Sequence, residues 1–459
     1  MESTAGDRSG ESRRRQEWWA AQASEVDPRS LHLPAGFRWG VATSAHQVEG
    51  GTTANTWSAW ELTRRPDGSP AIARGQRCGP AANHWELLAT DLGLMRWLGV
   101  DLYRFSVEWS RVEPLPGHID HAALDRYRAW CQALIGAGIT PMVTLHHFTE
   151  PQWASEHGGF AYAGTVDAWL RFVHLCLDRF GDLVGDWVTI NEPVAYVVQG
   201  WVRGVWPPGL QEPATAVSVL ENLLLAHARA YHAIHERDGQ RRHRVGLAHH
   251  LMPLQAARGW NPADVLLARF ADAGYNRAVP EALRTGVLRL RLPGIRYAAR
   301  LHRLRGTQDF FGVNHSHRAL VVARLGADPS LDLRPRPSKR HDLGSVLRWA
   351  RRYGLPIVVT EHTTEHTTID GHTADDQRRR VLGSGLAELA AAVRDGADVR
   401  AYVHWSLIDT FEWTHGYDVG TGLFRVDRGD FHRTATGSAG YYREVIAAHR
   451  AGEAPVDRA

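Results

Sequence analysis

The sequence predicts a single α/β domain, an eight-stranded (β/α)8 TIM barrel with its active site at the C-terminal ends of the strands. Eight short apolar segments alternate with amphipathic segments whose apolar residues recur at helical spacing. The apolar segments are hydrophobic on both faces, as in WVTIN, PMVTL and PIVVT, which is typical of a parallel sheet buried on both sides. No glycine-rich phosphate loop follows an early strand, which disfavours an open doubly wound sheet.

The predicted strands are, in chain order, Arg38–Ala45, Val100–Val107, Ile139–His146, Asp186–Glu192, Arg244–Leu251, Phe310–Ser316, Pro356–His362 and Arg400–Leu407. The amphipathic segments predicted as helices are His84–Leu98, Ala122–Ala137, Val166–Phe180, Ala216–Arg237, Leu343–Tyr353 and Thr373–Arg394. Glycines mark several of their ends, as in GAGI, YGLP and DGADV. Strands and helices that alternate in this number indicate a closed barrel.

The barrel is expected to span residues 36–450, between a polar, disordered N-terminal arm (1–35) and a short C-terminal tail (451–459). Two long connections interrupt the alternation. We predict that Pro253–Thr307 is helical with loops, and that the Arg- and Pro-rich segment Arg318–His341 is an exposed loop.

Composition excludes several classes of protein. The net charge is only +3, and no basic stretch is interleaved with aromatic residues, so we expect no nucleic-acid partner. Cys78, Cys131 and Cys176 are widely spaced, which implies neither a disulfide framework nor a zinc ribbon. The first residues lack the apolar core of a signal peptide, and no apolar run is long enough to span a membrane. We therefore expect a cytoplasmic protein without a membrane partner.

Polar or aromatic side chains stand where the predicted strands end: Gln47, Arg104, His147, Asn191, Glu192, Asn314, Glu361 and Trp405. Two of them are carboxylates, Glu192 and Glu361, and glycoside hydrolysis requires one carboxyl group as acid and a second as nucleophile or base. Strand ends of a barrel face a common pocket, so these two groups are candidates for that pair. The alternative from spacing alone is that each glutamate pairs with an arginine and stabilises the rim.

From about Phe37 to about Tyr442 the chain resembles glycoside hydrolase family 1, the β-glucosidase family. The segments that carry the resemblance, in the family's order, are FRWGVATSAHQVEG, YRFSVEWSR, TLHHFTEP, TINEP, DFFGVN, GLPIVVTE and WSLIDTFEW. The resemblance implies that Glu192 is the general acid/base, Glu361 the nucleophile and Arg104 the cation that keeps the nucleophile ionised. It also implies a set of sugar-binding residues: Gln47, His147, Asn191, Asn314, Trp405, Glu412 and Trp413.

Several positions depart from the family pattern. The family normally has Tyr-Tyr after the equivalent of Asn314, and the second tyrosine hydrogen-bonds to the nucleophile, whereas this chain has His315 and Ser316. Phe148 stands where a tryptophan is usual, and Gly420-Thr421 stands where Arg-Phe is usual. Glu412, by contrast, is retained, and its charge would repel the phosphate of a phosphorylated sugar, which favours a neutral sugar.

The expected function is hydrolysis of the terminal β-D-glucosyl or a similar neutral sugar residue of a small glycoside, by two displacements with retention. Two alternatives stay open: a transglycosidase on the same scaffold, and a repurposed, non-hydrolytic family member in natural-product metabolism. We expect no cofactor and no metal. His362 and His366 are four residues apart, but they lie in a Thr-rich segment that does not resemble a metal site. The sequence predicts no oligomeric state.

Overall fold

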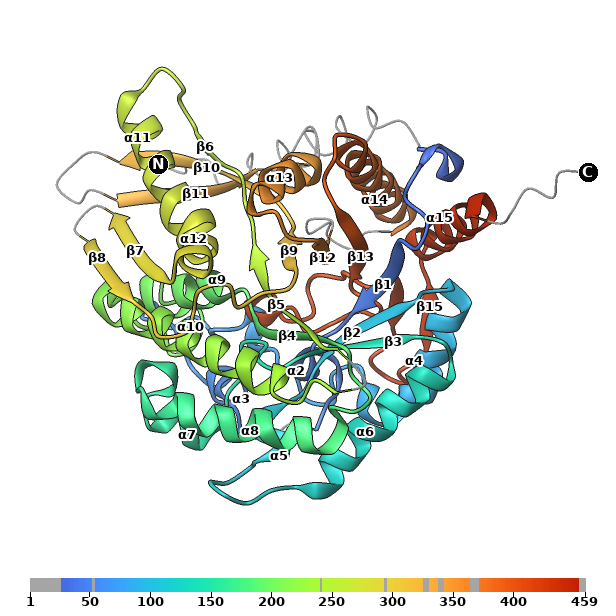
Figure 1. The fold of residues 1–459 in the computed structure, drawn as a ribbon, viewed down its shortest axis with the longest axis horizontal. Helices are drawn as coiled ribbons and strands as arrows, with labels where there is room; N and C mark the ends of the chain where they lie inside the picture. Colours follow the sequence, from blue (N-terminus) through green and yellow to red (C-terminus); the bar gives the residue numbers. More distant parts are fainter. Residues whose placement is uncertain are drawn as a thin grey trace, which may run out of the picture.

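The computed structural model describes residues 26–51, 54–239, 242–292, 295–324, 330–336, 342–363 and 371–453. Eight parallel strands form a closed barrel in the order β1-β13-β12-β9-β5-β4-β3-β2 (Figure 1). Their bounds are β1 Arg38–Ala42, β2 Leu102–Ser106, β3 Thr140–Thr144, β4 Asp186–Asn191, β5 Arg244–His250, β9 Phe311–His315, β12 Ile357–His362 and β13 Val399–Trp405. Each lies within, or one residue beyond, a predicted strand, so the predicted TIM barrel is confirmed.

Helices surround this barrel (Figure 1). Those predicted from periodicity are α4 His84–Leu98, α6 His121–Gly136, α8 Gly164–Phe180, α10 Pro213–His235, α13 Leu343–Ala350 with η6 Arg351–Tyr353, and α14 Gly371–Arg394. The shorter ones are α2 Ala45–Val48, α3 Thr56–Trp60, α5 Trp109–Val112, α7 Gln152–Glu156 and α9 Pro193–Val197. The C-terminal helix α15, Gly437–Glu453, packs beside α14 and α4 and was not predicted.

The strands bury both faces, as their composition predicts. One buried cluster is formed by strand residues and fills the barrel interior: Ala42, Leu102, Met142, Val188, Ala248, Phe310, Val358, Ala401, Val403 and Trp405. The alternate residues of the same strands, such as Tyr103, Val143 and Val359, belong to a second cluster shared with the helices. Two apolar layers around one sheet leave the strand ends as the place where polar groups gather.

The two long connections differ from their predictions. Within Pro253–Thr307, helices α11 (Pro262–Asp272) and α12 (Ala278–Thr285) form as expected, but β7 (Val287–Leu292) and β8 (Ile295–Arg300) make an antiparallel hairpin. The prediction of a loop over Arg318–His341 is wrong for the described part. There, β10 (Arg318–Arg324) and β11 (Ser330–Arg336) pair with each other, and β10 also pairs with β6 (Leu254–Ala256).

Alternation along the chain accounts for the hairpin. In β7 and β8, exposed residues alternate with buried or half-buried ones, which is the pattern of a strand with one solvated face. The loop expected over Arg318–His341 rested on arginine and proline content, and this composition does not prevent strand pairing. β10 is the central strand of its sheet, between β11 and β6.

The chain ends are described in part. Residues 1–25 of the predicted arm and 454–459 of the predicted tail lie outside the described residues. Of the rest of the arm, Pro28–Ser30 form a 3-10 turn, η1, which packs beside α15. None of the described helices has both the length and the apolar character that a membrane crossing requires.

The close spacing of β5 and β9 makes a glycine necessary in β9. A Cβ atom on Gly312 would lie 2.4 Å from the carbonyl oxygen of Leu247. We expect Gly312→Ala to lower the free energy of unfolding by about 1–3 kcal/mol, because backbone atoms must move to relieve the overlap. Gly93→Ala is the control, because its Cβ would meet nothing within 4 Å on an exposed helical face. Thermal unfolding at a fixed scan rate compares the two, and equal melting temperatures would contradict the expectation.

Candidate active site

Glu192 stands directly after β4, where the chain turns into helix α9. Its backbone adopts φ 42° and ψ 58°, a left-handed conformation that is unfavourable for a residue with a Cβ atom. Pro193 begins the helix, and the amide of Glu192 donates to the carbonyl of Ala248 on β5 at 2.8 Å. Strained backbone of this kind persists where the surrounding structure holds it, and it is common at functional sites.

Glu361 lies on β12 immediately after an irregularity in the sheet. The register with β9 pairs Val359 with Val313 and then Glu361 with Asn314, so Thr360 is an extra residue without a partner on β9. A bulge of this kind re-aims the side chains beside it. The Glu361 side chain is 13 % exposed, the access that a group which reacts with a ligand needs.

Arg104, on β2, joins the predicted site residues to one another. Its Nη1 donates to Glu361 Oε1 at 2.5 Å and to the carbonyl of Thr360 at 3.0 Å. Its Nη2 donates to Asn191 Oδ1 at 2.7 Å, and its Nε donates to the hydroxyl of Thr144 at 3.0 Å. Because this guanidinium is buried and its donors are engaged, it is a fixed positive charge beside Glu361.

Asn314, on β9, links the two carboxylates. Its Nδ2 donates to Glu192 Oε1 at 2.7 Å and to Asn191 Oδ1 at 3.0 Å. A continuous chain of hydrogen bonds therefore connects Glu361, Arg104, Asn191, Asn314 and Glu192. The structure thus brings both predicted catalytic glutamates to one end of the barrel.

Burial raises the pKa of both carboxyl groups, of Glu192 to about 7 and of Glu361 to about 8. The charge of Glu192 contributes to raising the pKa of Glu361, so the pair shares one proton near neutrality. Arg104 opposes the effect of burial and donates directly to Glu361. The two values belong to the pair as a whole. Within the pair we place the negative charge on Glu361, because the Arg104 guanidinium hydrogen-bonds to it, and the proton on Glu192.

Aromatic rings form one wall of the site. The His147 ring is stacked on Trp405, with centroids 5.5 Å apart and planes 14° apart, and on Trp413 at 6.1 Å and 17°. Asn191 Nδ2 contacts His147 Nε2 at 3.3 Å, which leaves Nδ1 as the protonated nitrogen. This Nδ1 is buried and has no hydrogen-bond partner in the described part of the chain. A buried donor of this kind suits a ligand hydroxyl.

The last two predicted residues, Gln47 and Glu412, lie on the same wall. The Gln47 amide accepts from Ser44 at 2.7 Å and donates to the carbonyl of Phe411 at 2.9 Å. Glu412 Oε1 accepts from Thr410, from Thr421 at 3.1 Å and from Trp405 Nε1 at 3.4 Å. Burial raises the pKa of Glu412, and these hydrogen bonds oppose the rise. Both side chains are therefore held by protein groups before any ligand binds.

His315 and Ser316 lie in the positions where the family has two tyrosines. His315 Nδ1 contacts the carbonyl of Leu251 at 2.8 Å, and the Ser316 hydroxyl contacts His317 Nδ1 at 2.7 Å. Among the interactions of the described residues, neither side chain hydrogen-bonds to Glu361. The side-chain donor to Glu361 is Arg104, and the amide of Asn314 also lowers the pKa of Glu361.

Three threonines in the site were not identified from the sequence. Thr360 donates to Asn314 Oδ1 at 2.7 Å, Thr144 accepts from Arg104, and Thr421 supports Glu412. Thr144 and Thr360 are part of quoted motifs, but threonine is also an ordinary strand residue. Thr421 stands where the family usually has a phenylalanine, and that replacement is the signal in the sequence that could have identified it.

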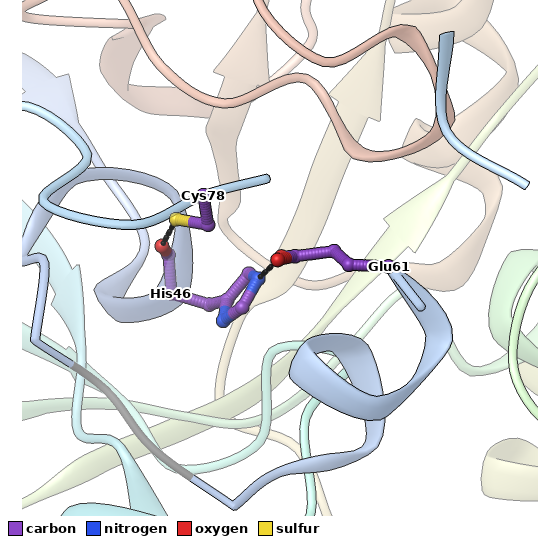
Figure 2. Close-up of side chains that lie close together, drawn as sticks. All are labelled: His46, Glu61 and Cys78. Atoms are coloured by element: carbon purple, nitrogen blue, oxygen red, sulfur yellow. Dashed lines mark hydrogen bonds and ion pairs between the residues drawn. The ribbon is translucent and has the colours of Figure 1, made fainter. Parts of the chain in front are cut away.

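One group of potential metal ligands lies beside the site, made of His46, Glu61 and Cys78, whose ligand atoms lie within 4.8 Å of one another (Figure 2). His46 Nε2 contacts Glu61 Oε1 at 3.2 Å, and the Cys78 thiol donates to the carbonyl of His46 at 2.8 Å. Asn55 uses its oxygen to cap α3 at the amide of Ser58. Its NH2 group therefore faces His46 Nδ1, at 3.1 Å.

This arrangement fits hydrogen bonding better than metal binding. An Nδ1 that accepts from Asn55 leaves the proton on Nε2, where a metal would have to bind. Burial also raises the pKa of the Cys78 thiol, which disfavours the thiolate that a metal needs. The His46 ring stacks on Trp413 with planes 7° apart, so the group supports the aromatic wall. His366, which follows His362 by four residues in the Thr-rich segment, lies outside the described residues.

A separate cavity of about 450 Å³ opens beyond the end of β5. Leu251, Met252, Val265 and Trp349 are among the residues that line it, and none of the ten predicted site residues does. This cavity is therefore separate from the predicted site.

Comparisons with known proteins agree with this geometry. The family model described as "Glycosyl hydrolase family 1" matches residues 29–328 and 339–451. The thermostable β-glucosidase B of Thermobispora bispora is 32% identical over 443 residues, which cover 91% of each chain. The human cytosolic β-glucosidase is 29% identical over 441 residues, 86% of this chain and 94% of its own.

Solved structures are similar over nearly the whole chain. The psychrophilic β-glucosidase of Micrococcus antarcticus superposes with a TM-score of 0.83 at 28% identity and covers 93% of this chain and 100% of its own. The β-glycosidase of Pyrococcus horikoshii gives a TM-score of 0.79 at 31% identity, over 91% of this chain and 95% of its own.

Proposed function

Because the chain belongs to glycosyl hydrolase family 1 and is therefore a retaining β-glycosidase, we propose that it removes the terminal, non-reducing β-D-glucosyl or similar neutral sugar residue from a small glycoside. The observation that carries this proposal is the hydrogen-bonded chain from Glu361 through Arg104, Asn191 and Asn314 to Glu192. It holds two partly buried carboxyl groups in different environments at one end of a barrel.

We assign the two carboxyl groups to the two steps of a double displacement. Glu361, with Arg104 bound to it, attacks the anomeric carbon while protonated Glu192 donates its proton to the departing oxygen. A covalent glycosyl ester on Glu361 results. Glu192, now ionised, takes a proton from water, whose oxygen attacks the same carbon and releases Glu361. Two inversions at one carbon give overall retention.

The remaining predicted residues are assigned to the sugar. We assign His147 Nδ1 and Glu412 Oε2, which has no hydrogen bond among the described residues, to ring hydroxyl groups, and Trp405 to the apolar face of the ring. Asn191 is assigned to the 2-hydroxyl group, a contact that strengthens in the transition state. The negative charge of Glu412 favours a neutral sugar over a phosphorylated one.

The second candidate function is transglycosylation, in which an acceptor alcohol replaces water in the second step. The first step is the same, so the contacts of Glu192 and Glu361 support both outcomes equally. Product analysis in the presence of added alcohol distinguishes them, because a transglycosidase forms the new glycoside in preference to free sugar. The third possibility, a non-hydrolytic protein, is disfavoured because binding alone does not require two carboxylates at one site.

The test of the proposed function is to trap the covalent intermediate with 2,4-dinitrophenyl 2-deoxy-2-fluoro-β-D-glucoside. The fluorine slows both steps, while the good leaving group allows the intermediate to accumulate. Peptide mass spectrometry should find a fluoroglucosyl adduct on Glu361, and no such adduct on Glu361→Gln. Absence of the adduct, together with no turnover of a panel of aryl β-glycosides, would overturn the proposal.

The shared proton leads to a definite pH dependence. Activity requires the singly protonated pair, which is the main form between the two pKa values of about 7 and about 8. We expect a narrow bell for kcat/KM with its maximum between about pH 7 and 8, falling about tenfold per pH unit on either side. Glu192→Gln should remove the alkaline limb, because it has no proton to lose. A flat profile from pH 5 to 9 would contradict this expectation.

A further inference from the structure

Thr360, the bulge residue of β12, contacts the donors of both carboxylates. It is fully buried and precedes Glu361. Its hydroxyl donates to Asn314 Oδ1 at 2.7 Å, and its carbonyl accepts from Arg104 Nη1 at 3.0 Å. Because Thr360 has no partner on β9, it can make these contacts in place of the regular sheet ladder.

The contacts of Asn314 show what the hydroxyl does. Asn191 Oδ1 already accepts from Arg104 Nη2 at 2.7 Å and can only accept from Asn314, at 3.0 Å. The NH2 group of Asn314 must therefore face Asn191 and Glu192, and its oxygen must face Thr360. The Thr360 hydroxyl is the donor that satisfies this buried oxygen, and without it the oxygen would be buried without a partner.

Asn314 is especially important in this chain because Ser316 replaces the family tyrosine. The Ser316 hydroxyl contacts His317 and lies 3.5 Å from His250 Nε2. The NH2 group of Asn314 donates to Glu192, and it lowers the pKa of both carboxyl groups. If Asn314 moves, Glu192 loses its donor and the pKa of both groups changes.

We propose that Thr360 is the positioning residue of the carboxylate pair, because it holds Asn314 through its hydroxyl and Arg104 through its carbonyl so that both donors stay aimed at Glu192 and Glu361. The inference rests on the proposed function for the roles of the two glutamates. Thr360 itself contacts neither carboxyl group among the hydrogen bonds of the described residues, so it acts through Asn314 and Arg104.

The charged and polar groups that face Glu192 and Glu361 determine whether loss of the Thr360 hydroxyl raises or lowers the pKa of these carboxyl groups. Glu192 is faced by Arg104 from β2, Asn314 from β9, Glu361 from β12 and Tyr275 from the helical turn η5 (Ala273–Arg277). His147 lies on the far side of Asn191, and burial and Arg104 keep its pKa well below its usual value, so it is neutral. Loss of the Thr360 hydroxyl weakens only the Asn314 contact, so the pKa of both carboxyl groups should rise. The whole pH profile then moves to higher pH.

The experiment compares three variants with the parent enzyme on 4-nitrophenyl β-D-glucopyranoside. Thr360→Val keeps the shape without the hydroxyl, Thr360→Ala removes the hydroxyl with less risk of crowding, and Thr360→Ser keeps the hydroxyl. We expect Val and Ala to lower kcat/KM by about 10- to 100-fold and to move both limbs of the profile to higher pH. Ser should restore the rate and both limbs.

Two results would overturn the inference. One is a Ser variant as impaired as the Val and Ala variants, which would assign the effect to the methyl group and to packing. The other is a Val or Ala variant whose limbs coincide with those of the parent. If Thr360→Val does not fold, as judged by circular dichroism, the comparison of Thr360→Ala with Thr360→Ser is sufficient to test the inference.

A measurement without substrate separates this inference from the proposed function. Protein labelled with ¹³C at the glutamate carboxyl carbon is titrated by NMR, and the signals of the pair are assigned with Glu192→Gln and Glu361→Gln. A shift of their titration in Thr360→Ala that Thr360→Ser reverses supports the inference even if no glucoside is turned over. If the titration in Thr360→Ala is unshifted while the enzyme does form the Glu361 adduct, the inference about Thr360 is rejected and the proposed function stands.

Discussion

Glu361→Gln should lower kcat/KM for 4-nitrophenyl β-D-glucopyranoside by at least about 10⁴-fold. The amide oxygen of glutamine is a poor nucleophile, and the ester on which the second step depends cannot form. The substitution also leaves the Arg104 guanidinium, which donates to Glu361 at 2.5 Å, without its carboxylate. Initial rates at several substrate concentrations, with the fold checked by circular dichroism, measure the loss.

A matched control separates the loss of a nucleophile from the loss of a buried ion pair. Glu49 is buried and accepts from Arg111 Nε at 3.0 Å and from the Tyr127 hydroxyl at 2.8 Å. Glu49→Gln removes an equivalent buried charge at a position with no assigned role in the reaction. It should keep most of the activity even if it is less stable. Equal losses in the two variants would assign the effect of Glu361→Gln to folding.

The sequence predicts the barrel because the strands must be apolar on both faces, and residues such as Val143 and Val188 satisfy that requirement locally. The same logic predicts the site, because a polar residue that ends an apolar run must lie at the strand end. Glu192 is found in this way, directly after β4, whereas Arg104 lies in the middle of β2. The structure joins the two through Asn191 and Asn314.

The features of the site that the sequence does not predict depend on the register between neighbouring strands. The role of Thr360 exists only because a bulge shifts the pairing of β12 with β9, and a bulge leaves no trace in a period-two pattern. The direction of the Ser316 hydroxyl depends on His250 and His317, which come from different strand ends. The sequence shows that a tyrosine is missing there, but it cannot show that Asn314 donates to Glu192 and Arg104 to Glu361.

Glu192→Ala should distinguish the two steps of the reaction. Removal of the acid lowers the rate of the first step by about 10²- to 10⁴-fold for glycosides with poor leaving groups, which cannot depart without a proton. The first step on 2,4-dinitrophenyl β-D-glucoside should be nearly unchanged, because dinitrophenolate leaves as an anion. The second step lacks its base on either substrate, so the glycosyl ester on Glu361 should accumulate after a burst of dinitrophenolate.

Azide then tests whether the cavity left by Glu192 faces the anomeric carbon. As an anion it needs no general base, and it is no longer repelled by a carboxylate. It should attack the anomeric carbon of the ester, which breaks the bond from that carbon to the Glu361 oxygen and forms a β-glucosyl azide. Rate recovery with this product, and none in Glu361→Gln, assigns the two roles as proposed. An α-glucosyl azide from Glu192→Ala would contradict these roles, and so would rate recovery in Glu361→Gln. Azide attacks from the face on which the carboxyl group is missing, so the configuration of the product identifies that group.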